Sequence, residues 1–221
     1  MSDDAPMTVD RLPGKIPIFP LAGALLLPRG QMPLNIFEPR YLAMTRDAIA
    51  GDGMIGMIQP RWAEREDPDD RPDVYDTGCL GQIVSNRETD DGRMLITLAG
   101  LIRFEVDEEL PLQEGYRRVI PRYDRFADDL DEPPGDVVDR PRLMLALRAW
   151  LASREITADW STIEETPDER LITVLSMTCP FEPNEKQALL ESPDLHERSR
   201  VMTALIEMSL MGGDEAPTGR H

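Results

Sequence analysis

The sequence predicts an α+β protein in which a small, closed or nearly closed antiparallel barrel with one inserted helix precedes an α-helical bundle. Three observations support this class. Prolines cut the first apolar runs into short pieces, an Asp-Gly turn joins two later runs, and helical spacing dominates after an acidic, proline-containing stretch. A chain of 221 residues has room for one or two domains with a core of their own.

The β-rich part is expected over residues 15–125, after a disordered tail at residues 1–14. Its first apolar runs lie at residues 16–19, 24–27 and 32–37. Prolines within and between these runs exclude a continuous helix, so each run is a short strand or a corner. Helical spacing then begins at Glu38, and Pro39 suits the first helical turn because its missing N–H needs no partner there.

Later runs in the same part indicate more short strands. We expect them at residues 54–58, 78–87, 93–99, 101–106 and 116–123. A charged loop at residues 59–77 separates the first two of these. Residues 89–92 end in Asp-Gly, which favours the positive φ of a hairpin turn, so the strands that flank it are expected to pair antiparallel.

The chain changes character after an acidic linker that is expected at residues 126–135. A helical part is expected over residues 136–211, followed by a disordered tail at residues 212–221. An apolar stripe at helical spacing consists of Leu143, Leu147, Trp150 and Leu151. Residues 166–169 predict a capping box with a first-turn proline, and further helices are expected to begin at Asn184 and Ser192.

Several segments share one resemblance. They read P-I-F-P-L at 17–21, L-L-P-R-G at 26–30, I-F-E-P-R-Y at 36–41, G-C-L-G-Q-I at 78–83, D-G-R-M-L-I-T-L-A-G-L-I-R-F at 91–104, E-K-Q-A-L-L-E at 185–191 and L-H-E-R at 195–198. In this order they resemble the N-terminal substrate-binding domain of the Lon ATP-dependent protease, most of all its small free-standing bacterial version. The resemblance implies a PUA-like pseudo-barrel and the binding of unfolded or damaged polypeptide.

The chemistry of a complete Lon protease is not found in the sequence. A P-loop needs a glycine-rich turn that ends in Gly-Lys-Ser/Thr, but the only Gly-Lys pair, Gly14-Lys15, is followed by Ile16. A Ser-Lys peptidase needs a desolvated lysine, and we expect both lysines, Lys15 and Lys186, to be solvated. We therefore expect no enzymatic activity.

Histidine and cysteine positions argue against a triad, a metal site or a cofactor. His196 lies in a polar first helical turn, and His221 is the last residue of the sequence. Cys79 and Cys179 are too far apart in sequence to form a close ligand pair, and we expect both to be free thiols in a reducing compartment. Residues 1–10 lack signal-peptide features, and no apolar run approaches the ~20 residues of a membrane helix. A cytoplasmic protein without a membrane partner is expected.

Polypeptide recognition requires an apolar groove and an exposed strand edge rather than reactive groups. The candidate contact residues are Met32, Leu34, Phe37, Tyr41, Trp62, Tyr75 and Phe181. Core packing is the favoured interpretation for the first four, which lie within residues 32–41. For Trp62, in the charged loop, core packing and polypeptide contact are equally favoured. The sequence leaves open whether the domain acts as an adaptor or regulator for a separate protease, and whether it forms oligomers.

Three charged residues of the resembling segments are interpreted as structural. Glu38 and Arg40 lie where a strand gives way to a helix, and Arg103 lies on a largely apolar strand. We expect Glu38 to form a buried ion pair with Arg103 or Arg40, whose loss would be strongly destabilising.

RNA binding is the alternative function, because PUA-like barrels also bind RNA. The basic residues available for it are Arg117, Arg118, Arg122 and Arg125. Neighbouring residues of a strand point to opposite faces, so these four cannot form a single stripe. The net charge of −18 repels a polyanion, which makes polypeptide the leading partner and argues against nucleic acid.

Overall fold

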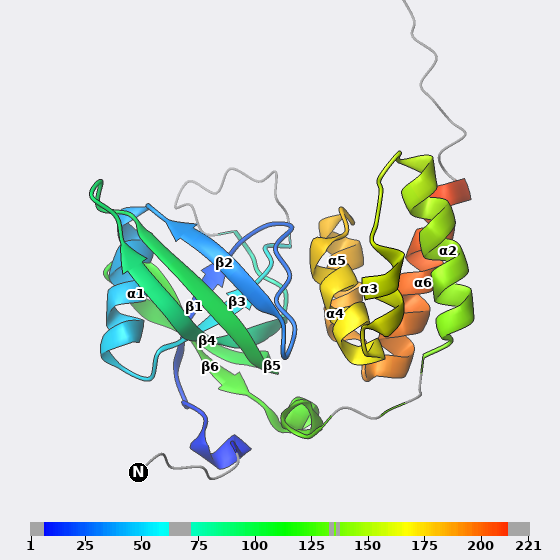
Figure 1. Cartoon of the computed structure of the whole chain (residues 1–221). Coiled ribbons are helices and arrows are strands. Elements are labelled where there is room, and N and C mark those ends of the chain that lie inside the picture. Colours follow the sequence, from blue (N-terminus) through cyan, green and yellow to red (C-terminus); the bar gives the residue numbers. More distant parts are fainter. Residues whose placement is uncertain (1–6, 62–71, 133–134, 136–137, 212–221) are drawn as a thin grey trace, which may run out of the picture.

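The computed structural model describes residues 7–61, 72–132, 135 and 138–211, which form two parts lying side by side (Figure 1). The barrel part contains the 3-10 helices η1 (Val9–Arg11) and η2 (Asp124–Leu130), the strands β1 (Ile16–Pro20), β2 (Gln31–Ile36), β3 (Met54–Ile58), β4 (Thr77–Glu88), β5 (Met94–Gln113) and β6 (Tyr116–Arg122), and the helix α1 (Pro39–Ala50). The helical part contains α2 (Arg140–Ser153), α3 (Trp160–Glu165), α4 (Asp168–Thr178), α5 (Pro183–Glu191) and α6 (Leu195–Met211). The predicted α+β class is confirmed.

The sheet closes into a barrel through its longest strand. The strand order is β2-β5-β4-β3-β1-β6, and β6 also pairs with the second half of β5, while β2 and β4 pair with the first half. Every pair is antiparallel except β1 with β3, so the expectation of purely antiparallel pairing is wrong for that pair. The loop before β2 crosses β5 at Gly100, where a Cβ atom would lie 2.0 Å from the carbonyl oxygen of Leu27.

The elements that rest on local sequence signals form as expected. Pro39 lies in the first turn of α1, and Gly92 has a φ of 81° in the turn between β4 and β5. In that turn the Thr89 N–H donates to the Arg93 carbonyl at 2.9 Å. The proline and Asp-Gly signals were sufficient because both act on the residues beside them.

Elements that depend on tertiary packing differ from the expectation. Residues 24–27, expected to be either a short strand or a corner, are a loop whose Leu25, Leu26 and Leu27 are all buried, because it packs into the core without joining the sheet. The runs at 93–99 and 101–106 belong to one continuous strand, β5. Apolar composition alone therefore indicated burial correctly but not hydrogen-bonded pairing.

The segments expected to be a tail and a linker are partly ordered. Residues 9–11 form η1, and the Tyr123 hydroxyl donates to the carbonyl of Pro13 at 3.0 Å. η2 occupies the first half of the expected linker and buries Phe126, whose exposed fraction is 2%. Residues 1–6 of the expected tail and residues 133–134 of the expected linker lie outside the described residues.

Helix capping also differs from the expectation. The predicted capping box at residues 166–169 does not form: Pro167 is the N-cap of α4 and makes no side-chain capping bond, while the Thr166 hydroxyl donates to the Thr162 carbonyl. A capping box is found instead at α5, between Glu182 and Glu185. The short helix α3, capped by Asp159, was not predicted.

The barrel and the helical part share a buried polar junction as well as a continuous apolar core. The Gln59 side chain donates to the Pro183 carbonyl at 3.0 Å and to the Gln187 side chain at 3.1 Å. Lys186, expected to be solvated, is buried instead, and its ammonium donates to the Gly23 carbonyl at 2.8 Å. Desolvation lowers the pKa of this lysine. The two parts therefore meet through specific hydrogen bonds.

Candidate functional site

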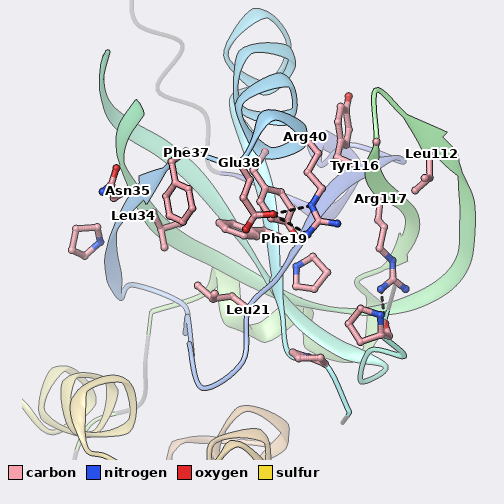
Figure 2. A pocket seen from close by; sticks show the side chains of 16 residues that line it. Phe19, Leu21, Leu34, Asn35, Phe37, Glu38, Arg40, Leu112, Tyr116 and Arg117 are labelled. Carbon is pink, nitrogen blue, oxygen red and sulfur yellow. Dashed lines mark hydrogen bonds and ion pairs between the residues drawn. The ribbon is translucent and has the colours of Figure 1, made fainter. Parts of the chain in front are cut away.

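A cavity of about 700 Å³ opens between the start of α1, the strand β2, the end of β1 and the hairpin that joins β5 to β6 (Figure 2). We call it the β2 pocket. Apolar and aromatic side chains make up most of its lining: Phe19, Pro20, Leu21, Pro33, Leu34, Phe37, Tyr41, Pro60, Pro72 and Leu112. Its size suits one or a few large side chains of a ligand.

The switch from strand to helix turns one aromatic ring outward. β2 ends at Ile36, which is buried, and α1 begins at Pro39. Phe37 lies between them and is 60% exposed at the mouth of the pocket (Figure 2). The rings of Phe19 and Tyr41, which also line the pocket, pack against each other with centroids 4.3 Å apart. Phe37 thus adds to a continuous apolar lining with Leu34 and Tyr41, and contiguous exposed apolar surface of this kind often marks a binding groove.

The charged groups of the pocket rim are paired within the protein. The Arg40 guanidinium donates to the Glu38 carboxylate at 2.8 and 3.1 Å, and Arg117 forms a bidentate contact with Glu109 at 2.7 and 2.8 Å. Arg117 also donates to the carbonyl of Pro72 at 2.7 Å. Because each of these cations already has a carboxylate partner, the pocket offers apolar surface rather than a site for a charged ligand group.

The Glu38 pair differs from its expected form. Glu38 pairs with Arg40, one of its two expected partners. The pair is not buried, however, because the exposed side-chain fractions are 27% for Arg40 and 43% for Glu38. The guanidinium also lies 4.9 Å from the ring centroid of Tyr41. These residues therefore shape the rim of the pocket rather than filling a core.

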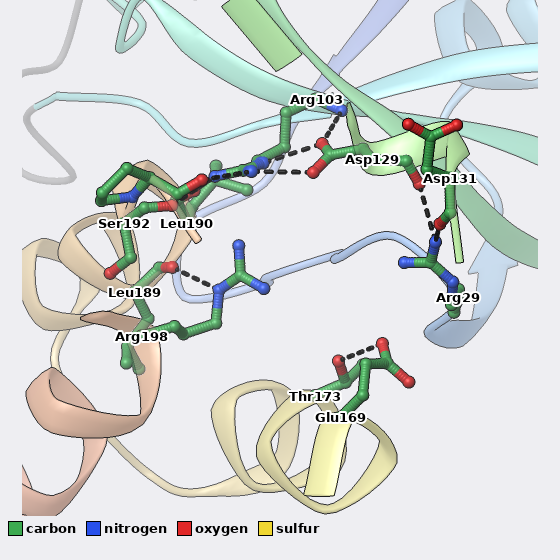
Figure 3. Close-up of polar contacts among 11 residues, drawn as sticks. Arg29, Arg103, Asp129, Asp131, Glu169, Thr173, Leu189, Leu190, Ser192 and Arg198 are labelled. Carbon is green, nitrogen blue, oxygen red and sulfur yellow. Dashed lines mark hydrogen bonds and ion pairs between the residues drawn. The ribbon is translucent and has the colours of Figure 1, made fainter. Parts of the chain in front are cut away.

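Arg103, the other expected partner of Glu38, is placed elsewhere. It is 3% exposed at the junction with the helical part and pairs with Asp129 of η2 at 2.7 and 2.8 Å (Figure 3). It also donates to the carbonyl of Leu190 near the end of α5 and to those of Ser192 and Pro193 between α5 and α6. The expectation of a Glu38–Arg103 pair is wrong, because Asp129 lies in a segment that had been taken for a linker.

A partly buried hydrogen-bonded group fixes the hairpin that forms the far wall of the pocket. The Asp47 carboxylate of α1 accepts from the Tyr116 hydroxyl at 2.7 Å and from the Gln113 side chain at 2.8 Å. Burial, with the nearby carboxylate, raises the pKa of the Tyr116 phenol. This contact joins residues almost seventy positions apart, and no local pattern in the sequence indicated it.

The structure brings three of the seven candidate contact residues into the β2 pocket: Leu34, Phe37 and Tyr41. Met32 is partly buried and packs against the core. The guanidinium carbon of Arg61 lies over the Tyr75 ring, 5.3 Å from the ring centroid. Phe181 is 9% exposed and belongs to the core. Trp62 lies outside the described residues. Sequence reasoning missed the other apolar lining residues, among them Pro60, Pro72 and Leu112.

The pocket lies beside a free strand edge. Among the described strands, β2 pairs only with β5, through a register that runs from Gln31 with Ala99 to Ile36 with Met94. The opposite edge of β2 therefore has main-chain groups that no described strand pairs with. Such an edge can accept a further strand.

The four arginines considered for RNA binding do not form a free basic surface. Arg117 pairs with Glu109, Arg125 with Glu105 at 2.8 Å, and Arg122 lies 3.4 Å from Asp107. Arg118 donates to the Pro111 carbonyl. Acidic neighbours thus offset three of the four charges that phosphates would have to meet.

Groups that could support other chemistry are few in the described part of the chain. No three His, Cys, Asp or Glu side chains there are arranged to hold a metal ion, and no helix there is long and apolar enough to cross a membrane. Cys79 and Cys179 are free and buried, and desolvation raises the pKa of both thiols, that of Cys179 to about 11. Neither is a reactive thiolate at neutral pH.

A barrel followed by a helical part, with an apolar pocket beside a free edge, defines the class of a binding domain. The family model of the ATP-dependent protease La (LON) substrate-binding domain matches residues 15–207, so the chain belongs to this family. The resemblance seen in the sequence is confirmed.

Relatives and solved structures agree with this assignment. Lon protease 2 of Myxococcus xanthus is 26% identical over 198 residues, which cover 88% of this chain and 24% of that protein. The Lon protease of Anaeromyxobacter dehalogenans is 25% identical over 197 residues, 88% of this chain and 23% of that one. The chain thus spans about a quarter of the length of these curated relatives.

Two solved structures share the fold. The Lon N-terminal domain protein from Xanthomonas campestris superimposes with a TM-score of 0.61 at 20% identity, covering 86% of this chain and 97% of that one. The N-terminal domain of the Mycobacterium avium complex Lon protease gives a TM-score of 0.58 at 17% identity, covering 87% and 98%. At these identities the likeness concerns the fold.

Proposed function

We propose that this protein is a non-enzymatic module that binds unfolded or extended polypeptide segments at the β2 pocket, as an adaptor or regulator of protein quality control in the cytoplasm. The exposed ring of Phe37 at the mouth of an apolar cavity of about 700 Å³ is the observation that carries the proposal. Family membership supports the same class of ligand.

The electrostatics of the pocket favour polypeptide over RNA. Rim cations are paired with carboxylates, and the net charge is −18. Phosphate neutralisation dominates nucleic-acid affinity, whereas burial of apolar side chains does not depend on ion pairing. We therefore expect weak binding of unfolded polypeptide, with a Kd on the order of micromolar, that changes little with salt concentration.

A titration at two salt concentrations tests this function. A reduced, unfolded protein and a structured RNA serve as the two ligands, with anisotropy or calorimetry as the readout. The proposal expects salt-insensitive binding of the polypeptide. Tight RNA binding that weakens steeply with salt, together with no polypeptide binding, would overturn it in favour of the RNA alternative.

The non-enzymatic part of the proposal has its own test. The purified protein is incubated with ATP and magnesium, and separately with unfolded casein. Both substrates should stay intact. Turnover that persists through repurification and disappears in a point variant of this chain would show that the module is an enzyme.

A further inference from the structure

The outer edge of β2 has a defined set of main-chain groups. The Gly100 N–H donates to the Gly30 carbonyl at 2.8 Å, and the antiparallel register with β5 continues without a shift to Ile36. Hydrogen-bonded pairs alternate along an antiparallel ladder, so every second residue from Gly30 faces β5. The main-chain groups of the residues between them, Gln31, Pro33 and Asn35, consequently point to the other edge.

The β2 pocket meets this strand along its backbone. Pro33, Leu34 and Asn35 all line the pocket, although successive side chains of a strand point to opposite faces. A cavity that contacts three consecutive residues must run beside the edge of the strand. The hollow is therefore placed where an added strand would lie.

A second cavity lies at the other end of the same strand. It measures about 470 Å³, and Gly30 and Gln31 form one side while Val174 and Met177 of α4 form the other. Figure 1 shows the start of β2 close to the helical part and its end close to α1. An extended chain of about five residues, at roughly 3.3 Å each, would reach from one cavity to the other along β2.

We propose that a client polypeptide binds as an added β-strand on the outer edge of β2, with an apolar side chain in the β2 pocket. This inference rests on the polypeptide binding proposed above and states its mode. The edge provides three acceptors, the carbonyls of Gln31, Pro33 and Asn35, and two donors, the N–H groups of Gln31 and Asn35. Only another backbone repeats donors and acceptors at the matching two-residue interval, and a backbone is common to all clients.

Pro33 makes a second copy of this chain a poor occupant. If β2 paired with itself in antiparallel fashion about Pro33, two prolines would face each other and both hydrogen bonds of that pair would be lost. A client without proline at that position loses only one. Proline on an edge strand is a known way to discourage pairing between identical edges.

An N-methyl scan of an apolar ten-residue peptide tests the mode of binding. Methylation of a single amide removes one donor and leaves the side chain unchanged. Amides that face β2 should lose roughly five- to tenfold in affinity, whereas the alternating amides should lose little, which gives a period of two along the peptide. A uniform effect, or none, would overturn strand addition.

Variants at position 35 isolate one donor of the protein. Asn35→Pro removes the outward N–H but no hydrogen bond to β5, and Asn35→Ala removes the side chain but keeps the N–H. We expect the proline variant to bind severalfold more weakly than the alanine variant at equal melting temperature. Equal affinities would contradict the proposal. Pro33→Val restores a donor to the edge and should tighten binding a fewfold; unchanged or weaker binding would count against strand addition.

The outcomes separate this inference from the function on which it rests. If Phe37→Ser abolishes peptide binding while the N-methyl scan has no period, strand addition is wrong and pocket binding stands. If the unmodified peptide does not bind at all, the proposed function itself fails. Self-association that is lost in Asn35→Pro would assign the edge to a second copy and overturn the inference.

Discussion

The junction between the two parts and the rim of the β2 pocket each contain an arginine paired with a carboxylate, but in opposite environments. Arg103 is 3% exposed, and its guanidinium reaches Asp129 and three main-chain carbonyls. Arg40 is 27% exposed and pairs with Glu38, which is 43% exposed. Water cannot solvate the charge that is left when one partner of the first pair is removed, whereas it can do so for the second pair.

This difference separates residues that hold the fold from residues that shape the rim of the proposed binding pocket. Removal of Arg103 would leave the Asp129 carboxylate and carbonyls of the α5–α6 corner without their donor in a buried place. Removal of Glu38 leaves an arginine that solvent can reach. The Glu38–Arg40 pair of the strand-to-helix segment therefore shapes the pocket more than it stabilises the fold.

The largest effect is expected at the junction. Arg103→Met should lower the free energy of unfolding by about 3–5 kcal/mol, because one partner of a buried pair is left uncompensated. Chemical denaturation measures it. The control is Arg122→Met, which removes an exposed arginine whose carboxylate contacts lie at 3.4 and 3.9 Å. A similar stability for both variants would remove the distinction between the two environments.

A second large effect tests whether Phe181 belongs to the core. Phe181→Ala should cost about 3 kcal/mol of stability, since the ring is 9% exposed among core residues. Peptide affinity of the folded variant should be unchanged. Ile156→Ala, at a residue that is 49% exposed, is the control for loss of an apolar side chain. A stable Phe181 variant that has lost peptide binding would restore the role expected from the sequence.

A small effect is expected at the rim. Glu38→Ala should change the free energy of unfolding by no more than about 1 kcal/mol, as for other solvent-exposed ion pairs. This expectation replaces the several kilocalories that a buried pair would have implied. A thermal melt beside wild type is sufficient. A loss as large as that of Arg103→Met would show that the rim is structural after all.

The smallest effect concerns another exposed contact, the cap of α3. Hydrogen bonds from Ser161 and Thr162 lower the pKa of the Asp159 carboxyl to about 2, from an ordinary value of 3.8. A carboxylate whose pKa is lowered in the folded state stabilises the protein when the pH is above the unfolded-state pKa. This contribution is lost as the pH falls through the folded-state pKa. The difference in melting temperature between wild type and Asp159→Asn should therefore be larger at pH 6 than at pH 3. A pH-independent difference would exclude this cap as its source.

Local signals predicted most of the barrel and the larger helices, because prolines, an Asp-Gly turn and apolar spacing act on neighbouring residues. The ordered η2 was missed, and the sequence left open whether residues 24–27 form a strand or a corner, since the burial of both segments depends on contacts from distant segments. For the same reason the sequence indicated Leu34, Phe37 and Tyr41 but not Pro60, Pro72 and Leu112. The pairing of β5 with β6 places Leu112 at the pocket, the pairing of β1 with β3 places Pro60 there, and a hydrogen bond from Arg117 holds Pro72.

The central claim is that the β2 pocket binds polypeptide, and Phe37 tests it most directly. Phe37→Ser removes a ring that is 60% exposed, and Val84→Ser removes an exposed apolar side chain on β4, 54% exposed, that does not line the pocket. Affinity for a reduced, unfolded protein is measured for both variants and wild type. We expect Phe37→Ser to weaken binding by roughly tenfold or more at an unchanged melting temperature, and Val84→Ser to bind like wild type. Equal affinity of all three proteins would contradict the claim.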